Sequence, residues 1–184
     1  MMNSDPFEEL ARDPGLRWAD ERYRAELRAE AEEYERLAAK DLLRGRNLQD
    51  VVRELCHRGD IAALVLDSRT LVGEIVYAAG DLARVRTLNG DIDVNLRGVT
   101  ALRVVERSLA GGRSCLRGPT SFTARLFEHE SAGDRVELST RMPTGEVIGR
   151  IHAVAIDHVV VTDDDGQFWY VPLSAIDCVA DCPI

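Results

Sequence analysis

The sequence predicts an α+β protein, mainly β, in which an N-terminal helix precedes two tandem units, each a helix followed by a small five-stranded barrel. Two observations carry this prediction. Apolar residues recur with helical spacing near the N-terminus, and the rest of the chain repeats itself at an offset of about 76 residues. A composition of 45% hydrophobic and 30% charged residues is that of a folded globular protein.

The N-terminal part is expected to hold a flexible tail and one amphipathic helix. Residues 1–18 form the tail, because Asp13-Pro14-Gly15 is a turn signal and little periodicity precedes it. A helix is predicted for 19–43, within the segment 19–46, and Gly45 is well placed to end it. Its apolar stripe comprises Tyr23, Leu27, Ala31, Tyr34, Ala38 and Leu42. This stripe either packs on the barrels or pairs with another chain.

The internal repeat rests on glycines, turns and strand patterns that stay in step. Gly73-Glu74-Ile75 matches Gly149-Arg150-Ile151, and Asp81 matches Asp157. The turn Leu88-Asn89-Gly90 matches Asp164-Asp165-Gly166, and the pattern from Val94 to Val99 matches that from Val171 to Ile176. Chance alternation of apolar residues does not keep all these features in register. We therefore infer two copies, at 47–106 and 119–184, joined by a linker at 107–118.

Each copy is predicted to hold one helix and five short strands. The helices are expected at 48–57 and 122–129. The strands are expected at 61–67, 71–78, 82–87, 92–96 and 101–105, and again at 135–140, 147–155, 158–162, 168–171 and 176–179. Short strands separated by Gly and Asp turns, such as those at Gly90 and Gly166, are typical of a small barrel. Gly73 and Gly149 lie within strands, where a residue without Cβ permits a sharp bend and close packing.

This pattern resembles the Sm-like fold, in which a helix precedes five bent strands with a glycine midway along the second. Leu96-Arg97-Gly98-Val99 is similar to that family's second motif, which carries Arg-Gly before the last strand. The second copy, around Tyr170-Val171-Pro172, is closer to the bacterial Hfq-type variant or to PRC-type barrels. The resemblance implies barrels of Sm-like or SH3-like architecture, edge pairing of the kind that builds that family's rings, and RNA as a ligand.

The residues that bind RNA in the Sm-like family are mostly not carried over. The family places an Asp and an Asn between strands two and three, and the corresponding positions here are Ala79, Ala83, Ala155 and Val159. Arg97 is the one retained contact, and Ser174 takes its place in the second copy. RNA binding would therefore depend on the arginines of the first barrel forming one cluster, namely Arg84, Arg86, Arg97 and Arg103.

The charge of the chain constrains its partners. The net charge is −9 at pH 7, and acidic residues outnumber basic ones in each of 1–46, 47–106 and 107–184. Attraction to phosphate backbones is thus unfavourable, and RNA is a disfavoured partner. No signal-peptide pattern is present, and no apolar run approaches the roughly 20 residues that span a bilayer. We expect a cytoplasmic chain with no membrane partner, whose cysteines are reduced.

No motif for catalysis, metal binding or a cofactor is recognisable. Asp163-Asp164-Asp165-Gly166 lacks the Glu that a calcium loop places six residues after its glycine, so it is interpreted as a hairpin turn. Cys178, Cys182 and the pair Cys56-His57 do not have the spacing of a zinc site. The other histidines are isolated in the sequence and are His129, His152 and His158. We therefore predict a protein that is not an enzyme and holds no catalytic residue, metal or cofactor.

The most concentrated aromatic group is Phe168-Trp169-Tyr170. Alternation along a strand puts Trp169 on the face opposite its two neighbours, so one face is core, and the other is either covered by the N-terminal helix or anchors a partner. Barrel edges left open tend to pair with another chain. The sequence thus predicts a binding or scaffolding module that acts through protein contacts and self-assembly as a homo-oligomer. An RNA-binding regulator is the alternative. The candidate interface residues are Trp169, Tyr170, Tyr23, Leu27 and Tyr34.

Overall fold

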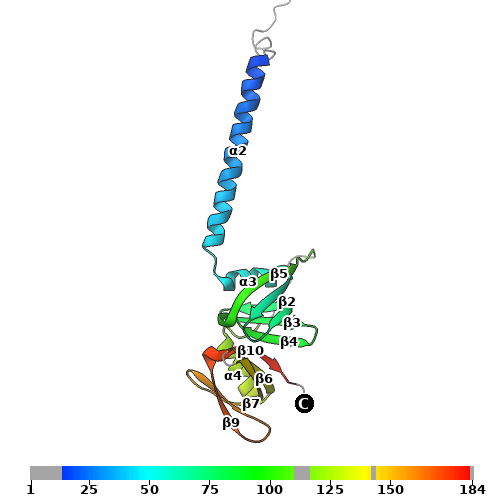
Figure 1. The fold of residues 1–184 in the computed structure, drawn as a ribbon, viewed down its shortest axis with the longest axis vertical. Coiled ribbons are helices and arrows are strands. Elements are labelled where there is room, and N and C mark those ends of the chain that lie inside the picture. The colour runs from blue at the N-terminus through cyan, green and yellow to red at the C-terminus, as the bar shows by residue number, and fades with distance from the viewer. Residues whose placement is uncertain (1–13, 110–116, 142–143, 183–184) are drawn as a thin grey trace, which may run out of the picture. The chain divides into compact units, whose positions relative to one another are not determined.

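The structure, a computed structural model, describes residues 14–109, 117–141 and 144–182 (Figure 1). The chain divides into two compact units, residues 1–46 and 47–184. Residues 1–13 of the predicted tail (1–18) and residues 110–116 of the predicted linker (107–118) lie outside the described residues.

The first unit contains one long helix, and the second contains all described strands. The helices are α2 (Pro14–Arg44), α3 (Leu48–Arg58) and α4 (Phe122–Ala132). The strands are β1 (Ile61–Leu66), β2 (Thr70–Ala79), β3 (Leu82–Thr87), β4 (Gly90–Asn95), β5 (Val99–Glu106), β6 (Arg135–Arg141), β7 (Thr144–Val154), β8 (His158–Thr162), β9 (Phe168–Pro172) and β10 (Ile176–Asp181). Two short 3-10 helices, η1 (Leu96–Gly98) and η2 (Leu173–Ala175), precede β5 and β10.

Helix α2 begins at Pro14, earlier than the predicted start at residue 19. Proline suits the first turn of a helix because the N–H that it lacks has no partner there. The helix ends at Gly45, whose N–H donates to the Asp41 carbonyl at 3.2 Å. All six residues of the predicted stripe, Tyr23, Leu27 and Tyr34 among them, are exposed. Within the described residues, no helix has both the length and the apolar character needed to cross a membrane.

The strands of the second unit form one open antiparallel sheet. Its order is β5-β1-β2-β3-β4-β10-β6-β7-β8-β9. The two halves of this unit, a first half from α3 to β5 and a second half from α4 to β10, therefore have the same strand order. The predicted closure of each half into one of two tandem barrels is not confirmed, because β4 pairs with β10 and joins the halves into a continuous open sheet. The predicted α+β, mainly β class is confirmed.

The two halves also match in their irregularities. A β-bulge interrupts the β2–β3 ladder after Ile75, and another interrupts the β7–β8 ladder after Ile151. The glycines two residues earlier, Gly73 and Gly149, occupy equivalent surroundings. A Cβ at Gly73 would lie 2.2 Å from the Arg86 carbonyl oxygen. A Cβ at Gly149 would lie 2.3 Å from that of Thr162. Both strands therefore bend against a neighbour that leaves no room for a side chain.

Each half carries one helix with matched ends. The Asn47 side chain caps α3 in a reciprocal capping box, and Ser121 caps α4. Both helices stop at a glycine in the left-handed conformation, Gly59 with φ 72° and Gly133 with φ 68°. Helix α3 packs on β2 and α4 packs on β7. The same local signals thus place a helix against the bent strand in each half.

The hydrophobic core consists of two clusters that exchange residues between the halves. The first cluster is built around Leu64 and Ile75 and also takes in Cys178 from β10. The second is built around Leu126 and Leu138 and also takes in Tyr77 and Leu82 from the first half. Burial at about 25 cal/mol per Å² of apolar surface makes this exchange a stabilising link. The inner junction, defined as the contact between the two halves along β4 and β10, is therefore part of the core.

Candidate assembly interface

The inner junction is held by backbone pairing of two strands that would otherwise be edges. Cys178 lies opposite Val94, Val179 opposite Asp93, and Ala180 opposite Ile92, in antiparallel register. The sequence gives no direct signal of this pairing, because main-chain hydrogen bonds between edge strands are available to almost any side chain.

A buried cluster of charges lies beside this pairing. Asp93 of β4 accepts from Arg84 Nε at 2.9 Å and from Arg84 Nη2 at 2.6 Å. Arg125 of α4, from the other half, lies 3.3 Å from the same carboxylate, and His129 Nε2 lies at 3.8 Å. Burial alone would raise the pKa of Asp93, but His129, Arg84 and Arg125 outweigh it and hold that pKa below its usual range. The cluster is thus a charged lock between the halves.

The start of α4 is anchored on the turn between β2 and β3. Asp81 Oδ1 accepts from the Phe122 N–H at 2.9 Å, at the positive end of the helix dipole. The Tyr77 hydroxyl donates to the Pro119 carbonyl at 2.6 Å. Gly80, at φ +53°, leaves only 2.4 Å between a would-be Cβ and the Thr120 carbonyl oxygen. This side of the first half is shaped to receive the helix of the second.

A second polar contact crosses the inner junction at its other end. The buried Asp177 of β10 accepts from Ser68 Oγ at 3.0 Å and lies 3.1 Å from Arg141 Nε. Asn95 Nδ2 donates to the Ile176 carbonyl at 3.0 Å. These contacts fix the register of β4 against β10, because a slip would leave buried polar groups unpaired.

Two strand edges of the sheet have no partner strand among the described residues, and they are called the outer edges here. They are β5, the counterpart of β10, and β9, the counterpart of β4. On β9 the aromatic side chains are exposed: Phe168 by 54%, Trp169 by 49% and Tyr170 by 69%. Trp169 Nε1 donates to Asp163 Oδ2 at 2.8 Å, and the next inward residue, Val171, is buried. The expectation that one aromatic face fills the core is wrong for this group.

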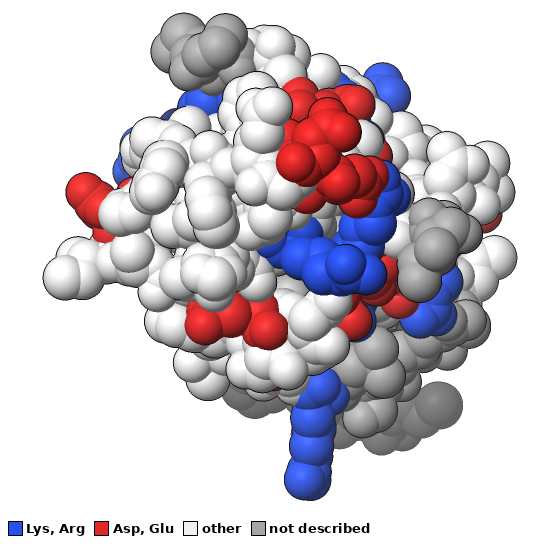
Figure 2. All heavy atoms as spheres, turned by 90° about the horizontal axis from the view of Figure 1, so that it is seen from below, with Lys and Arg blue, Asp and Glu red and all other residues white. Residues whose placement is uncertain are grey.

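Three of the four predicted nucleic-acid contacts are engaged by aspartates. Besides Arg84, Arg86 lies 3.1 Å from Asp91 and Arg97 lies 3.0 Å from Asp81. Arg103 is exposed on β5. On the face seen in Figure 2, acidic and basic side chains lie next to one another and form no extended basic surface. The arginines therefore do not combine into one free cationic patch.

Sequence reasoning missed the partners of these arginines. Arg84-Val85-Arg86 and Asp91-Ile92-Asp93 alternate across one hairpin, and the ladder sets Arg84 opposite Asp93. That alternation could have been found, since opposite charges on facing strand positions attract. Arg125 could not, because it reaches Asp93 only through the pairing of β4 with β10.

The remaining predicted residues have structural surroundings. Gly90 and Gly166 occupy turns with φ of 125° and 78°. In the acidic turn, Asp163 Oδ1 accepts from the N–H groups of Asp165 and Gln167 at 3.0 and 2.8 Å. Among the cysteines described by the structure, Cys56 and Cys178 are buried and Cys182 is half-buried. Cys115 lies outside the described residues.

Comparison with known proteins does not add a family. The chain matches no family model and no curated protein.

Proposed function

We propose that this protein is a non-enzymatic, self-assembling interaction module, whose two tandem small barrels of Sm-like kind join head to tail through their outer edges. One observation carries the proposal. The β4–β10 pairing already joins the halves inside the chain, and the open edges β9 and β5 are the counterparts of those two strands. The contact between chains therefore has a template in the molecule itself.

The repeat specifies the register of this contact. Leu102 and Val179 are counterparts, since they lie opposite Leu64 and Leu138 in the two halves. Tyr170 is likewise the counterpart of Asp93. The inner pair Val179–Asp93 then becomes Leu102 of one chain opposite Tyr170 of the next, with Arg103 opposite Trp169. Pro172 lies beyond the three paired positions, so its missing N–H costs this register no hydrogen bond.

The side chains at this contact are apolar where the inner junction is charged. Tyr170 replaces Asp93, and Val160 replaces Arg84. On the incoming helix, Val51 and Leu55 of α3 replace Arg125 and His129 of α4. Exposed aromatic residues that gain an apolar partner are typical anchors of a protein interface. The chemistry of the outer edges thus favours association over an open edge in water.

One turn must differ between the two contacts. Ile156, fully exposed, occupies the position of Gly80 between β7 and β8. At the inner junction, the absence of a side chain at Gly80 leaves room for the Thr120 carbonyl. At the outer edge, the Ile156 side chain occupies the corresponding space. The neighbouring helix is therefore held further from this turn, and Ile156 becomes part of the apolar contact. Because β5 and β9 are different surfaces, the contact is heterologous and produces a closed ring or an open filament.

Cross-linking at specified register tests this function. We expect the double variant Arg103→Cys with Trp169→Cys, in a Cys115→Ser, Cys182→Ser background, to form disulfide-linked ladders. Facing non-hydrogen-bonded positions lie within disulfide reach. The matched control, Ala101→Cys with Trp169→Cys, is two residues out of register and is expected to stay unlinked. Equal cross-linking of both pairs contradicts the register.

Sedimentation velocity of the full chain at micromolar concentration tests the association itself. The unmodified chain is expected to sediment as oligomers. Tyr170→Lys is expected to weaken association about 30-fold, the equivalent of a hot spot worth about 2 kcal/mol, because a lysine is introduced at the paired edge. A chain that sediments only as monomer, or an oligomer that Tyr170→Lys leaves unchanged, contradicts assembly through these edges.

A further inference from the structure

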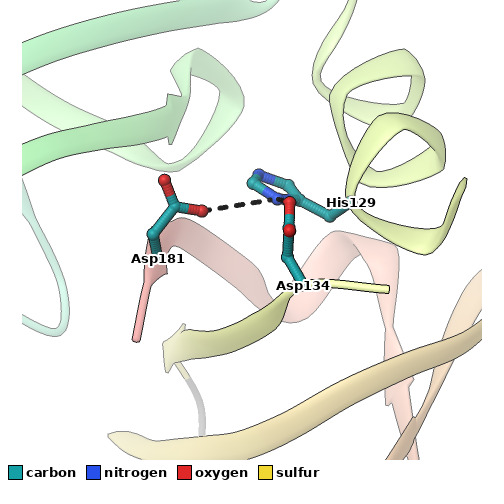
Figure 3. A group of neighbouring side chains, drawn as sticks. All are labelled: His129, Asp134 and Asp181. Carbon is teal, nitrogen blue, oxygen red and sulfur yellow. Dashed lines mark hydrogen bonds and ion pairs between the residues drawn. The ribbon is translucent and has the colours of Figure 1, made fainter. Parts of the chain in front are cut away.

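Three metal-ligating side chains converge beside the inner junction (Figure 3). His129 Nδ1, at the end of α4, lies 3.2 Å from Asp134 Oδ2 and 3.6 Å from Asp181 Oδ1. Asp134 directly precedes β6 and Asp181 ends β10. The ligand atoms of all three lie within 4.8 Å of one another. Three separate elements thus bring one imidazole and two carboxylates to a single point.

The orientation of the imidazole is a second, independent observation. The His129 side chain is only 6% exposed, and its Nε2 is buried without a hydrogen-bond partner among the described residues. Nδ1 is thereby turned toward the two carboxylates, while Nε2 is turned toward Asp93. A ligating histidine commonly donates its second N–H to a carboxylate, and the Asp93 carboxylate lies on that side of the ring, 3.8 Å from Nε2.

Asp93, on the other side of the ring, is already paired with Arg84 and Arg125. Asp134 and Asp181 are not part of that pairing. They lie at Nδ1, where their two carboxylates offer anionic ligands to one cation.

The spacing agrees with a small four-coordinate ion. Bonds of about 2.0–2.2 Å in tetrahedral geometry set ligand atoms about 3.4 Å apart. The two observed separations from Nδ1, 3.2 and 3.6 Å, lie on either side of this value. Asp134 and Asp181 are exposed, so an ion has access from solvent and keeps a position for water.

We propose that His129, Asp134 and Asp181 bind a divalent transition-metal ion of the Zn²⁺ type. Imidazole and carboxylate ligands are those that this ion accepts in proteins. The bound ion would tie the end of β10 to α4 within the second half, beside the inner junction. The first half has no such site, because Leu55 holds the position of His129. The two positions are equivalent, since the Leu55 carbonyl accepts from the N–H of Gly59 and the His129 carbonyl accepts from the N–H of Gly133 at the ends of their helices. This inference goes beyond the proposed assembly and does not depend on it.

Titration of the metal-free full chain with Co²⁺ tests the site, because four-coordinate Co²⁺ gives a visible absorption band that Zn²⁺ then displaces. We expect one equivalent of Co²⁺ to bind. His129→Leu, which copies the first half, is expected to weaken binding at least 10-fold, and the exposed Asp181→Asn is expected to do the same without affecting folding. Far-UV circular dichroism checks the fold of both variants.

Two controls separate this site from other ligands. His158→Asn removes a half-buried histidine elsewhere, and Cys182→Ser removes the half-buried thiol next to Asp181. Both are expected to leave Co²⁺ binding unchanged. The proposal is overturned if the unmodified chain gives no displaceable band, if Asp181→Asn binds as tightly as the unmodified chain, or if Cys182→Ser abolishes the band.

Discussion

The inner junction and the outer edges are built from counterpart strands, yet their chemistry is opposite. At the inner junction, Asp93 is buried between Arg84 and Arg125. At the outer edge, the corresponding strand presents Tyr170 in an exposed position. The backbone register has been kept in both halves, while the side chains have diverged. A repeat can thus conserve the backbone register in which strands pair and still change which side chains a partner strand must present.

In the proposed assembly, this difference gives the inner junction and the outer edges different partners. An aspartate with two arginines is stable only when all three are together, because a buried charge without a partner is costly. An apolar edge gains nothing from meeting such charges. Suppose that β9 of a second half took the place of β4 at the inner junction. Tyr170 would then stand where Asp93 stands, and Arg125 would meet an aromatic residue in place of its carboxylate. Specificity of this kind needs an unfavourable alternative as well as a favourable match.

The largest expected effect comes from breaking the charged lock. Asp93→Ala leaves the partly buried Arg84 without its carboxylate and Arg125 with only the exposed Glu128, which is expected to lower the free energy of unfolding by about 3–5 kcal/mol. Urea denaturation of the full chain, followed by circular dichroism, measures this change. The matched control is Asp91→Ala, two residues before Asp93 on the same strand. It removes the same group, a carboxylate, from an ion pair with the exposed Arg86. Its loss is expected to be much smaller, and equal losses would show that the lock is an ordinary surface ion pair.

The next largest loss of stability is expected at the two bent strands, β2 and β7. Here the halves are expected to behave alike. Gly73→Ala and Gly149→Ala each force a Cβ against a neighbouring carbonyl oxygen, with an expected cost of about 1–3 kcal/mol each. Thermal unfolding measures both. Gly166→Asn is the control, since its turn has φ 78° with no atom nearby and Asn tolerates that conformation. A large loss at only one of the two strand glycines would mean that the halves differ in curvature.

The glycines also show which features of the fold could be predicted from the sequence. Gly73 and Gly149 recur at a fixed offset, and the close approach that requires them is local to two adjacent strands. Helix ends such as Asn47 and Gly59 are equally local, so the elements and their order could be predicted. The joining of β4 to β10 could not, because edge pairing uses main-chain groups that every sequence offers. Arg125, which reaches Asp93 from the other half, depends on that pairing and could not be predicted either, whereas Arg84 lies opposite Asp93 within one hairpin.

The candidate interface divides in the same way. Trp169 and Tyr170 were identified from their concentration in the sequence, and their exposure agrees with a role as anchors. The choice between core and surface could not be made beforehand. It depends on which strand becomes an edge of the sheet, and the period of two within one strand carries no information about that.

The smallest expected effect lies at Arg97, where the two halves differ in sequence but not in strand pairing. Its side chain is largely exposed while it pairs with Asp81, and Ser174 is its counterpart in the second half. Arg97→Ser copies that half and is expected to change the free energy of unfolding by less than about 1 kcal/mol, because exposed ion pairs contribute little. Asp81 keeps the Phe122 N–H as a donor. The same variant, titrated with fluorescent U-rich RNA at low salt, tests the alternative function. Salt-dependent binding that Arg97→Ser abolishes would favour a nucleic-acid role, whereas the assembly proposed here predicts neither RNA binding nor a change in sedimentation.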